Sequence, residues 1–246
     1  GVEPQTETVW HQADKYHVPR IAFINKLDRI GSDYFRVIDM IAEKFGADPI
    51  PLQIPLGRED SFYGVVDLIT MQAIAWDEGD LGATYHTMSI PAEYKEQAVS
   101  YRERLFDKIS LFDDELMELY LDGKEIEPSR IYGALRKGTI GLKCVPVLCG
   151  TALRNKGIQP LLDAVVRYLP SPLDVPAVTG ENPQTHELEE RKASDDEDLA
   201  ALAFKIVMEE GRKLTYIRIY SGSLKVGGDV YNVNLGKKEK ISRIYK

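Results

Sequence analysis

Four consecutive residues, Asn25-Lys26-Leu27-Asp28, carry the clearest chemistry in the sequence. An ionised aspartate accepts two hydrogen bonds side by side, and guanine offers such a pair of donors at its N1–H and its exocyclic N2 amine. Adenine offers neither donor there, so it would leave a desolvated Asp28 unpaired. Sites that pair in this way reject an analogue lacking the group by roughly 10⁴–10⁵. The four residues therefore predict a guanine-base site.

Two other side chains of this motif can assist. Asn25 carries an amide that can donate to guanine N7, and Lys26 has an apolar stem that can lie along the base plane. Asn and Asp are also common turn formers, so the same string occurs in ordinary turns after a strand. The surrounding sequence has to decide between these two interpretations.

A second turn, Gly150-Thr151-Ala152-Leu153, supplies that context. It follows residues 144–149, a run that is apolar throughout, as in a strand buried on both faces. We expect the backbone N–H of Ala152 to face guanine O6 and the hydroxyl of Thr151 to stiffen the turn. Adenine carries a donor in place of O6 and would be repelled. A turn that merely contains Ala is the alternative, but two strand-end signals in this order favour the guanine site.

Each turn needs a strand before it and a helix after it. Residues 21–24 are an apolar run, and residues 34–45 repeat apolar side chains at helical spacing. Further helices are predicted over 5–17 and 158–169. The apolar side of the last helix comprises Leu161, Leu162, Val165, Val166 and Leu169. This order of elements predicts an α/β, doubly wound sheet, which binds ligands at the carboxyl ends of its strands.

Residues 49–140 break the α/β pattern and predict an inserted α+β subdomain. Glycines mark turns between short predicted strands at 51–56, 64–67, 71–76 and 85–90. Helices are predicted at 92–110, 113–121 and 127–137. Asp113 and Asp114 are placed to cap the second of these helices. We interpret the acidic stretch that begins there as a solvated helix face rather than a metal site.

The character of the sequence changes again after residue 170. Pro170, Pro172 and Pro176 predict a stiff linker, and the polar residues up to 198 predict a mobile loop. From residue 199 apolar and polar side chains alternate with a period of two, between glycine-containing turn signals. Residues 199–246 therefore predict the first strands of an antiparallel β-barrel.

The net charge, the cysteines and the apolar runs of the sequence argue against several classes of function. The net charge of −8 over 246 residues does not favour non-specific nucleic-acid binding. Cys144 and Cys149 lack metal or redox spacing and are expected to be small buried side chains in a reducing, cytoplasmic setting. No apolar run approaches the ~18 residues of a membrane span, and no signal peptide opens the chain. The sequence predicts a soluble globular protein without a membrane partner.

These motifs closely resemble those of the translation elongation factor G family, the ribosomal translocation GTPases, over essentially the whole chain. The specific stretches are 1–10 (GVEPQTETVW), 20–30 (RIAFINKLDRI), 64–68 (GVVDL), 168–176 (YLPSPLDVP) and 193–206 (ASDDEDLAALAFKI). Leu27 stands where members usually have Met, and Thr151 stands where they usually have Ser. Related release-factor and ribosome-protection GTPases are an alternative that the opening stretch and the insertion disfavour.

The resemblance implies a domain organisation and a set of ligands. Residues 1–48 and 141–175 would be the C-terminal part of a GTPase domain, and 49–140 the family's inserted G-prime subdomain. Residues 176–198 would be a linker, and 199–246 the start of the second domain. The implied ligands are GTP or GDP with Mg²⁺, and the implied partner is the ribosome, through rRNA and ribosomal proteins. The implied guanine-site residues are Asn25, Lys26, Leu27, Asp28, Thr151, Ala152 and Leu153.

One family motif is missing. The phosphate cradle Gly-x-x-x-x-Gly-Lys-[Ser/Thr] does not occur in the sequence. Because the chain starts with Gly1 in what resembles mid-fold, we expect a fragment whose catalytic residues and Mg²⁺ site lie upstream, and which is inactive alone but can self-associate. A non-enzymatic ribosome- or protein-interaction module with a vestigial nucleotide site is the alternative.

Overall fold

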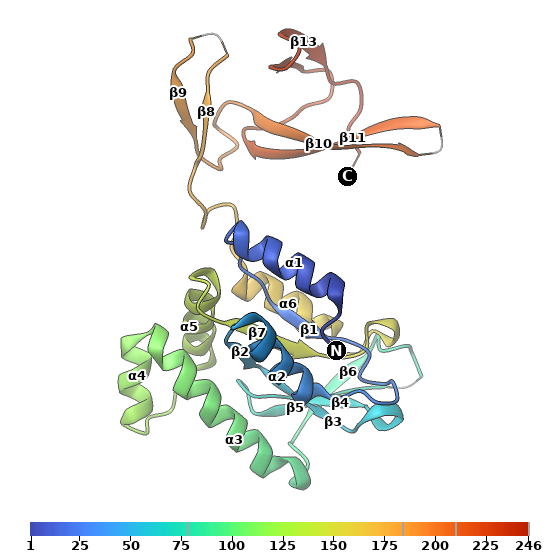
Figure 1. Cartoon of the computed structure of the whole chain (residues 1–246), viewed down its shortest axis with the longest axis vertical. Helices are drawn as coiled ribbons and strands as arrows, with labels where there is room; N and C mark the ends of the chain where they lie inside the picture. Colours follow the sequence, from blue (N-terminus) through green and yellow to red (C-terminus); the bar gives the residue numbers. More distant parts are fainter. Residues whose placement is uncertain (78, 184, 210, 246) are drawn as a thin grey trace. The chain divides into compact units, whose positions relative to one another are not determined.

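The computed structural model describes residues 1–77, 79–183, 185–209 and 211–245. The chain divides into two compact units, residues 1–169 and residues 170–246, each with sheets of its own (Figure 1). Both candidate turns lie in the first unit. The structure thus confirms a mixed α/β fold that also contains antiparallel sheets.

A three-stranded parallel sheet forms the centre of the first unit, with the strand order β1-β7-β2. Its strands are β1 (Ala22–Ile24), β7 (Val145–Cys149) and β2 (Pro49–Pro51). Ile24 pairs with Cys149, so β1 and β7 end level with each other. All five residues of β7 are buried, as the apolar run predicts for a strand covered on both faces.

Helices cover both faces of this sheet. They are α1 (Pro4–Lys15), α2 (Tyr34–Phe45), α5 (Pro128–Ile140) and α6 (Ile158–Tyr168). On one face Trp10 of α1 stacks on Phe45 of α2, with ring centroids 4.3 Å apart, and packs with Val145. On the other face Leu148 packs with residues of α5 and α6. Successive side chains of β7 therefore pack into two separate cores, one on each face of the sheet.

A second, antiparallel sheet follows with the order β3-β4-β5-β6. Its strands are β3 (Gln53–Leu56), β4 (Gly64–Asp67), β5 (Gln72–Trp76) and β6 (Tyr85–Met88). Helices α3 (Ala92–Ile109) and α4 (Asp114–Leu121) come after it. These elements lie within a residue or two of the predicted ones, except at the start of the sheet.

The prediction of one strand over residues 51–56 was wrong, and the third strand of the parallel sheet, β2, was not predicted. The chain changes sheets at Leu52, between β2 and β3. The N–H of Leu52 donates to the Val147 carbonyl of the parallel sheet at 2.9 Å, while its own carbonyl accepts from the Leu68 N–H of the other sheet at 3.0 Å. One apolar run thus contains strands of two different sheets, and its periodicity alone could not show where the first strand ends.

Helix α6 also packs through a different side from the predicted one. Its buried residues are Ala164 and Tyr168, which are four positions apart on one side of the helix. Leu162, Val165 and Val166 are exposed. The prediction was wrong for these three, because the stripe they form points away from the side on which α6 meets the core.

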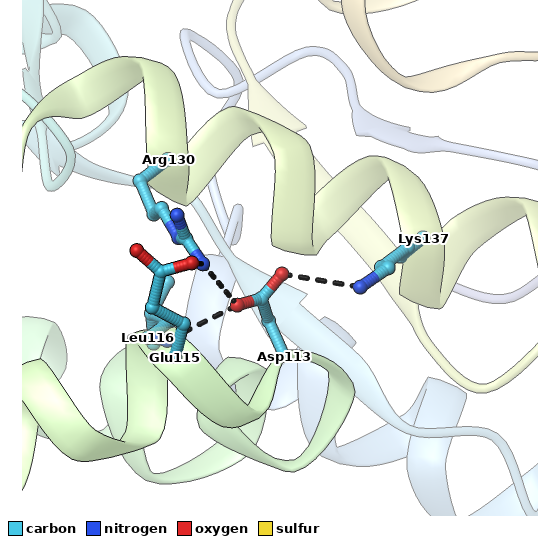
Figure 2. Close-up of polar contacts among 5 residues, drawn as sticks. All are labelled: Asp113, Glu115, Leu116, Arg130 and Lys137. Atoms are coloured by element: carbon cyan, nitrogen blue, oxygen red, sulfur yellow. Dashed lines mark hydrogen bonds and ion pairs between the residues drawn. The ribbon is translucent and has the colours of Figure 1, made fainter.

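The acidic stretch at the start of α4 is not simply solvated. Figure 2 shows the Asp113 carboxylate between two cations of α5, 2.9 Å from Arg130 Nη2 and 3.1 Å from Lys137 Nζ. Arg130 also pairs with Glu115. As predicted, Asp113 caps α4, because its carboxylate accepts from the Leu116 N–H at 3.0 Å. The interpretation as a solvated helix face was therefore wrong for Asp113, which joins α4 to α5.

Both cysteines are free thiols and buried, as predicted. Burial raises the pKa of the Cys144 thiol to about 11, so it remains protonated at neutral pH. Among the described residues, no helix has the length and apolar character that a membrane crossing requires.

The second unit consists, among its described residues, of antiparallel strand pairs. The pairs are β8 (Val178–Glu181) with β9 (Leu188–Arg191), β10 (Ala200–Glu209) with β11 (Arg212–Ser221), and β12 (Asp229–Asn232) with β13 (Lys237–Lys240). Two of them fall where the period-two pattern predicts strands. Strands β8 and β9 lie in the segment predicted as a mobile loop and are paired, so that prediction was wrong for residues 179–181 and 188–191.

Candidate functional site

The two predicted turns lie side by side because β1 and β7 are adjacent parallel strands. The N–H of Gly150 donates to the Ile24 carbonyl at 3.1 Å, and the N–H of Leu27 donates to the Gly150 carbonyl at 3.2 Å. The strand ladder thus continues past the strand ends and joins one turn to the other. Their place at the carboxyl edge of the sheet is where doubly wound folds bind ligands.

Both oxygens of the Asp28 carboxylate are engaged. The hydroxyl of Thr151 donates to Asp28 Oδ1 at 2.8 Å, and Nε of Arg154 lies 3.3 Å from Asp28 Oδ2. The Asp28 side chain is only 9% exposed. Thr151 itself is buried, and its N–H donates to the Lys156 carbonyl at 2.9 Å. The second turn therefore holds the carboxylate of the first in a fixed orientation.

Asn25 and Ala152 form a second contact across the two turns. The amide oxygen of Asn25 accepts from its neighbour, the Lys26 N–H, at 2.8 Å and from the Ala152 N–H at 2.9 Å. Lys26 has a φ of +64°, in the left-handed region, and its side chain is exposed. Asn25 thus braces the second turn through the same N–H that was predicted to face guanine O6.

The two leucines of the predicted site differ in their surroundings. Leu27 is 4% exposed and packs in the apolar core with Ile24 and Val147. Leu153 is 83% exposed. Leu27 therefore anchors its turn from beneath, whereas Leu153 lies at the surface beside the polar groups of the second turn.

The loop between β5 and β6 supports the second turn from outside. Asn155 Nδ2 donates to the Leu81 carbonyl, and Gln159 Nε2 donates to the Gly82 carbonyl, each at 3.0 Å. Gly82 has a φ of +74°, and a Cβ there would lie 2.3 Å from the Arg154 carbonyl oxygen. Only glycine fits this close approach, so the antiparallel sheet is in direct contact with the candidate site.

Arg154 is the residue of the site that the sequence analysis missed. Its charge is opposite to that of Asp28, and it follows Ala152 by two positions in the same turn. That proximity was the available signal, but the short 3₁₀ helix Ala152–Arg154 that turns it toward Asp28 was not predicted.

The donor set fits a purine base better than a metal ion. A carboxylate, an amide and a backbone N–H converge at one strand edge, which suits the hydrogen-bonding edge of guanine. Among the described residues, no group of three or more His, Cys, Asp or Glu side chains is arranged to hold a metal ion. A set of acceptors and donors of this kind can form hydrogen bonds to the edge of a base.

Comparisons with known proteins show which family the chain resembles. Residues 1–171 match the family described as the elongation factor Tu GTP binding domain. A protein named elongation factor G 2, from Syntrophus aciditrophicus (strain SB), is 54% identical over 246 residues, which cover 100% of this chain and 36% of that protein. A crystal structure of a protein from Thermus thermophilus covers 94% of this chain and 32% of that one, with a TM-score of 0.74 at 24% identity. This last likeness shows the fold alone.

Proposed function

Because the chain belongs to the family of the elongation factor Tu GTP binding domain, we propose that it works as part of a translational GTPase that moves tRNA and mRNA through the ribosome. The proposal is supported by the 54% identity to a protein named elongation factor G 2, of whose length the chain spans 36%. The alternative, a non-enzymatic interaction module with a vestigial nucleotide site, is not favoured by these comparisons.

Within that protein, the two turns of this chain would recognise the guanine base. Asp28 accepts from guanine N1–H and from the N2 amine, while Thr151 keeps the carboxylate oriented. Ala152 donates its N–H to O6 in place of Asn25, whose amide oxygen still accepts from the Lys26 N–H, and the Lys26 stem covers the base. Leu27 and Leu153 complete the two turns. The observation that carries the proposal is the hydrogen bond between Thr151 and Asp28, which lie 123 positions apart in the sequence.

Hydrolysis of GTP requires phosphate contacts and Mg²⁺, which supplies charge neutralisation at the phosphates. The 246 residues contain no Gly-x-x-x-x-Gly-Lys-[Ser/Thr] motif. We therefore assign no catalytic residue to this chain, and we expect the purified chain alone to bind guanine nucleotides weakly and not to hydrolyse them.

The domain organisation is part of the proposal. Residues 1–48 and 141–175 would form part of the GTPase domain, with 49–140 as an inserted subdomain. Residues 176–198 would link it to a β-barrel that begins at 199. The basic residues Lys237, Lys238, Lys240 and Arg243 of that part would lie toward rRNA phosphates. The protein would act in the cytoplasm.

Self-association of the chain is also proposed, on the basis of a strand edge. In the described part of the chain, β1 has a strand on one side only, because the order is β1-β7-β2. An unpaired edge presents backbone N–H and C=O groups that pair readily with another strand. A second copy is a suitable partner for this edge.

Calorimetric titration with GDP and ADP tests the function. We expect GDP to bind with a dissociation constant above about 1 µM, since each absent charge-assisted phosphate contact removes about 1.5–3 kcal/mol. ADP should bind more weakly still. Asp28→Ala should abolish the preference for GDP, and Asp122→Ala, which removes an exposed aspartate paired with Lys124, should retain it. Equal binding of GDP and ADP by the unmodified chain would contradict the proposal.

A further inference from the structure

We propose that Arg154 occupies the guanine-facing side of Asp28 when no nucleotide is bound, so that a base has to displace this arginine before it can pair. The inference rests on the proposed guanine site and concerns its regulation. It makes Arg154 a positioning residue that sets the affinity of the base site without contacting the reacting phosphates.

The ion pair between Arg154 and Asp28 lies where a base would have to bind. Arg154 Nε lies 3.3 Å from Asp28 Oδ2, and the other oxygen, Oδ1, accepts from Thr151. The Asp28 side chain is 9% exposed and that of Arg154 is 53% exposed. Arg154 thus covers the carboxylate from the solvent side. A base arriving from solvent meets the guanidinium at the oxygen with which it has to pair.

Only the side chain of Arg154 is free to move. Its N–H donates to the Thr151 carbonyl at 3.1 Å, and its own carbonyl oxygen packs against Gly82 so closely that a Cβ on Gly82 would lie 2.3 Å away. The backbone is thereby fixed at both ends of the residue. Release of Asp28 requires a rotation about the side-chain bonds of one half-exposed arginine, which takes nanoseconds or less.

The contact between Asn25 and Ala152 also has to be broken when a base binds. The Ala152 N–H, the donor assigned to guanine O6, is taken by the Asn25 amide oxygen at 2.9 Å. Both groups that would discriminate guanine are therefore satisfied within the chain when no base is present. Guanine binding exchanges these contacts for its own, so the measured affinity is lower than the intrinsic affinity of the open site.

The size of the effect follows from the exposure of the Arg154 side chain, which is 53% exposed although Asp28 is not. An ion pair whose cation is in contact with solvent changes an equilibrium by about two- to fivefold, and salt weakens it. Removal of the arginine should therefore raise the affinity for GDP by about two- to fivefold at low ionic strength. The gain should shrink toward onefold as salt is added, because screening releases Asp28 in the unmodified chain as well.

The test is titration of the full chain and its Arg154→Ala variant with GDP at low and high salt. Lys124→Ala is the matched control, since it removes an exposed cation that is also paired with an aspartate, Asp122. We expect tighter GDP binding by Arg154→Ala, a gain that salt diminishes, and no change in Lys124→Ala. Arg154→Lys, which keeps the charge, should stay close to the unmodified chain.

Unchanged or weaker GDP binding by Arg154→Ala would overturn the inference, because it would make Arg154 neutral or a direct ligand contact. An equal gain in Lys124→Ala would also overturn it, since net charge would then be the cause. Either result would leave the proposed guanine site standing, because the preference for GDP and its loss in Asp28→Ala do not depend on Arg154. Equal binding of GDP and ADP by the unmodified chain would instead contradict the guanine site, and the inference about Arg154 would then fall with it.

Discussion

Asp28 shows how neighbouring side chains orient a single carboxylate. A free aspartate pairs with any donor, but Thr151 holds one oxygen of Asp28 and Arg154 covers the other. The sequence allowed the partnership of Asp28 with the second turn to be predicted, because both turns follow apolar runs. The ion pair with Arg154 was not predictable, since it depends on the direction of one side chain in a short helix.

Asp113 provides a prediction about stability. Burial alone would raise the pKa of Asp113, but hydrogen bonds from Arg130, the Leu116 N–H and Lys137 outweigh it and lower the pKa to about 2. A carboxyl group with a lowered pKa in the folded state stabilises the fold above its ordinary pKa, and this contribution is lost as the pH falls from about 4 to about 2. Asp113→Ala should lower the free energy of unfolding at pH 7 by about 1–2 kcal/mol, chiefly through the lost cap.

Denaturant titration of three chains checks this prediction. Asp113→Asn is the matched control, because asparagine caps a helix about as well but pairs weakly with the two cations. It should fall between the unmodified chain and Asp113→Ala at pH 7. The difference between the unmodified chain and Asp113→Asn should shrink to a small fraction of its size at pH 7 by about pH 2. A difference that persists there at full size would show that the ion pairs do not stabilise the fold.

At the scale of elements, the local sequence predicted the bounds of a helix correctly where a capping residue precedes it and a glycine follows it. Helix α2 begins at Tyr34, after the capping Asp33, and ends before Gly46, which has a φ of +58°. The periodicity predicted the same bounds. The change of sheet at Leu52 was not predictable, because one of its two hydrogen-bond partners, Val147, lies far along the chain. Secondary structure that depends on distant strands leaves little trace in a local pattern.

The contact between the β5–β6 loop and the second turn makes an element-scale prediction. Gly82→Ala places a Cβ 2.3 Å from the Arg154 carbonyl oxygen at a φ of +74°. We expect a loss of about 1–3 kcal/mol in unfolding free energy, together with weaker GDP binding, because the turn that orients Asp28 must shift. Gly79→Ala, in the same loop, meets nothing within 4 Å and is the control. Denaturation and calorimetry would measure both effects. Equal behaviour of the two variants would contradict the coupling.

At the scale of the whole molecule, the two units differ in how much apolar surface they bury. The first unit contains every apolar side chain that is buried in the described part of the chain. In the second unit, Leu202, Phe204 and Ile206 of β10 are exposed. A hairpin without a covered face is marginally stable in water. The alternating sequence predicted these strands but could not show what packs on them.

Hydrogen exchange checks this difference in stability. Backbone amides of β7, which is central in its sheet and wholly buried, should exchange most slowly in the chain. Amides of β10 and β11 should exchange markedly faster, and β1, at the sheet edge, should lie between them. Protection of β10 equal to that of β7 in dilute solution would show that the exposed face is covered, for instance by a second copy.

NMR titration can establish whether the turns after β1 and β7 form one guanine site. Amide resonances of the ¹⁵N-labelled chain would be followed as GDP and, separately, ADP are added. We expect GDP to shift the amide signals of Ala152 and of residues 25–28, ADP to leave them in place, and Asp28→Ala to remove the response to GDP. Shifts confined to other parts of the chain, or equal shifts with ADP, would contradict the guanine site.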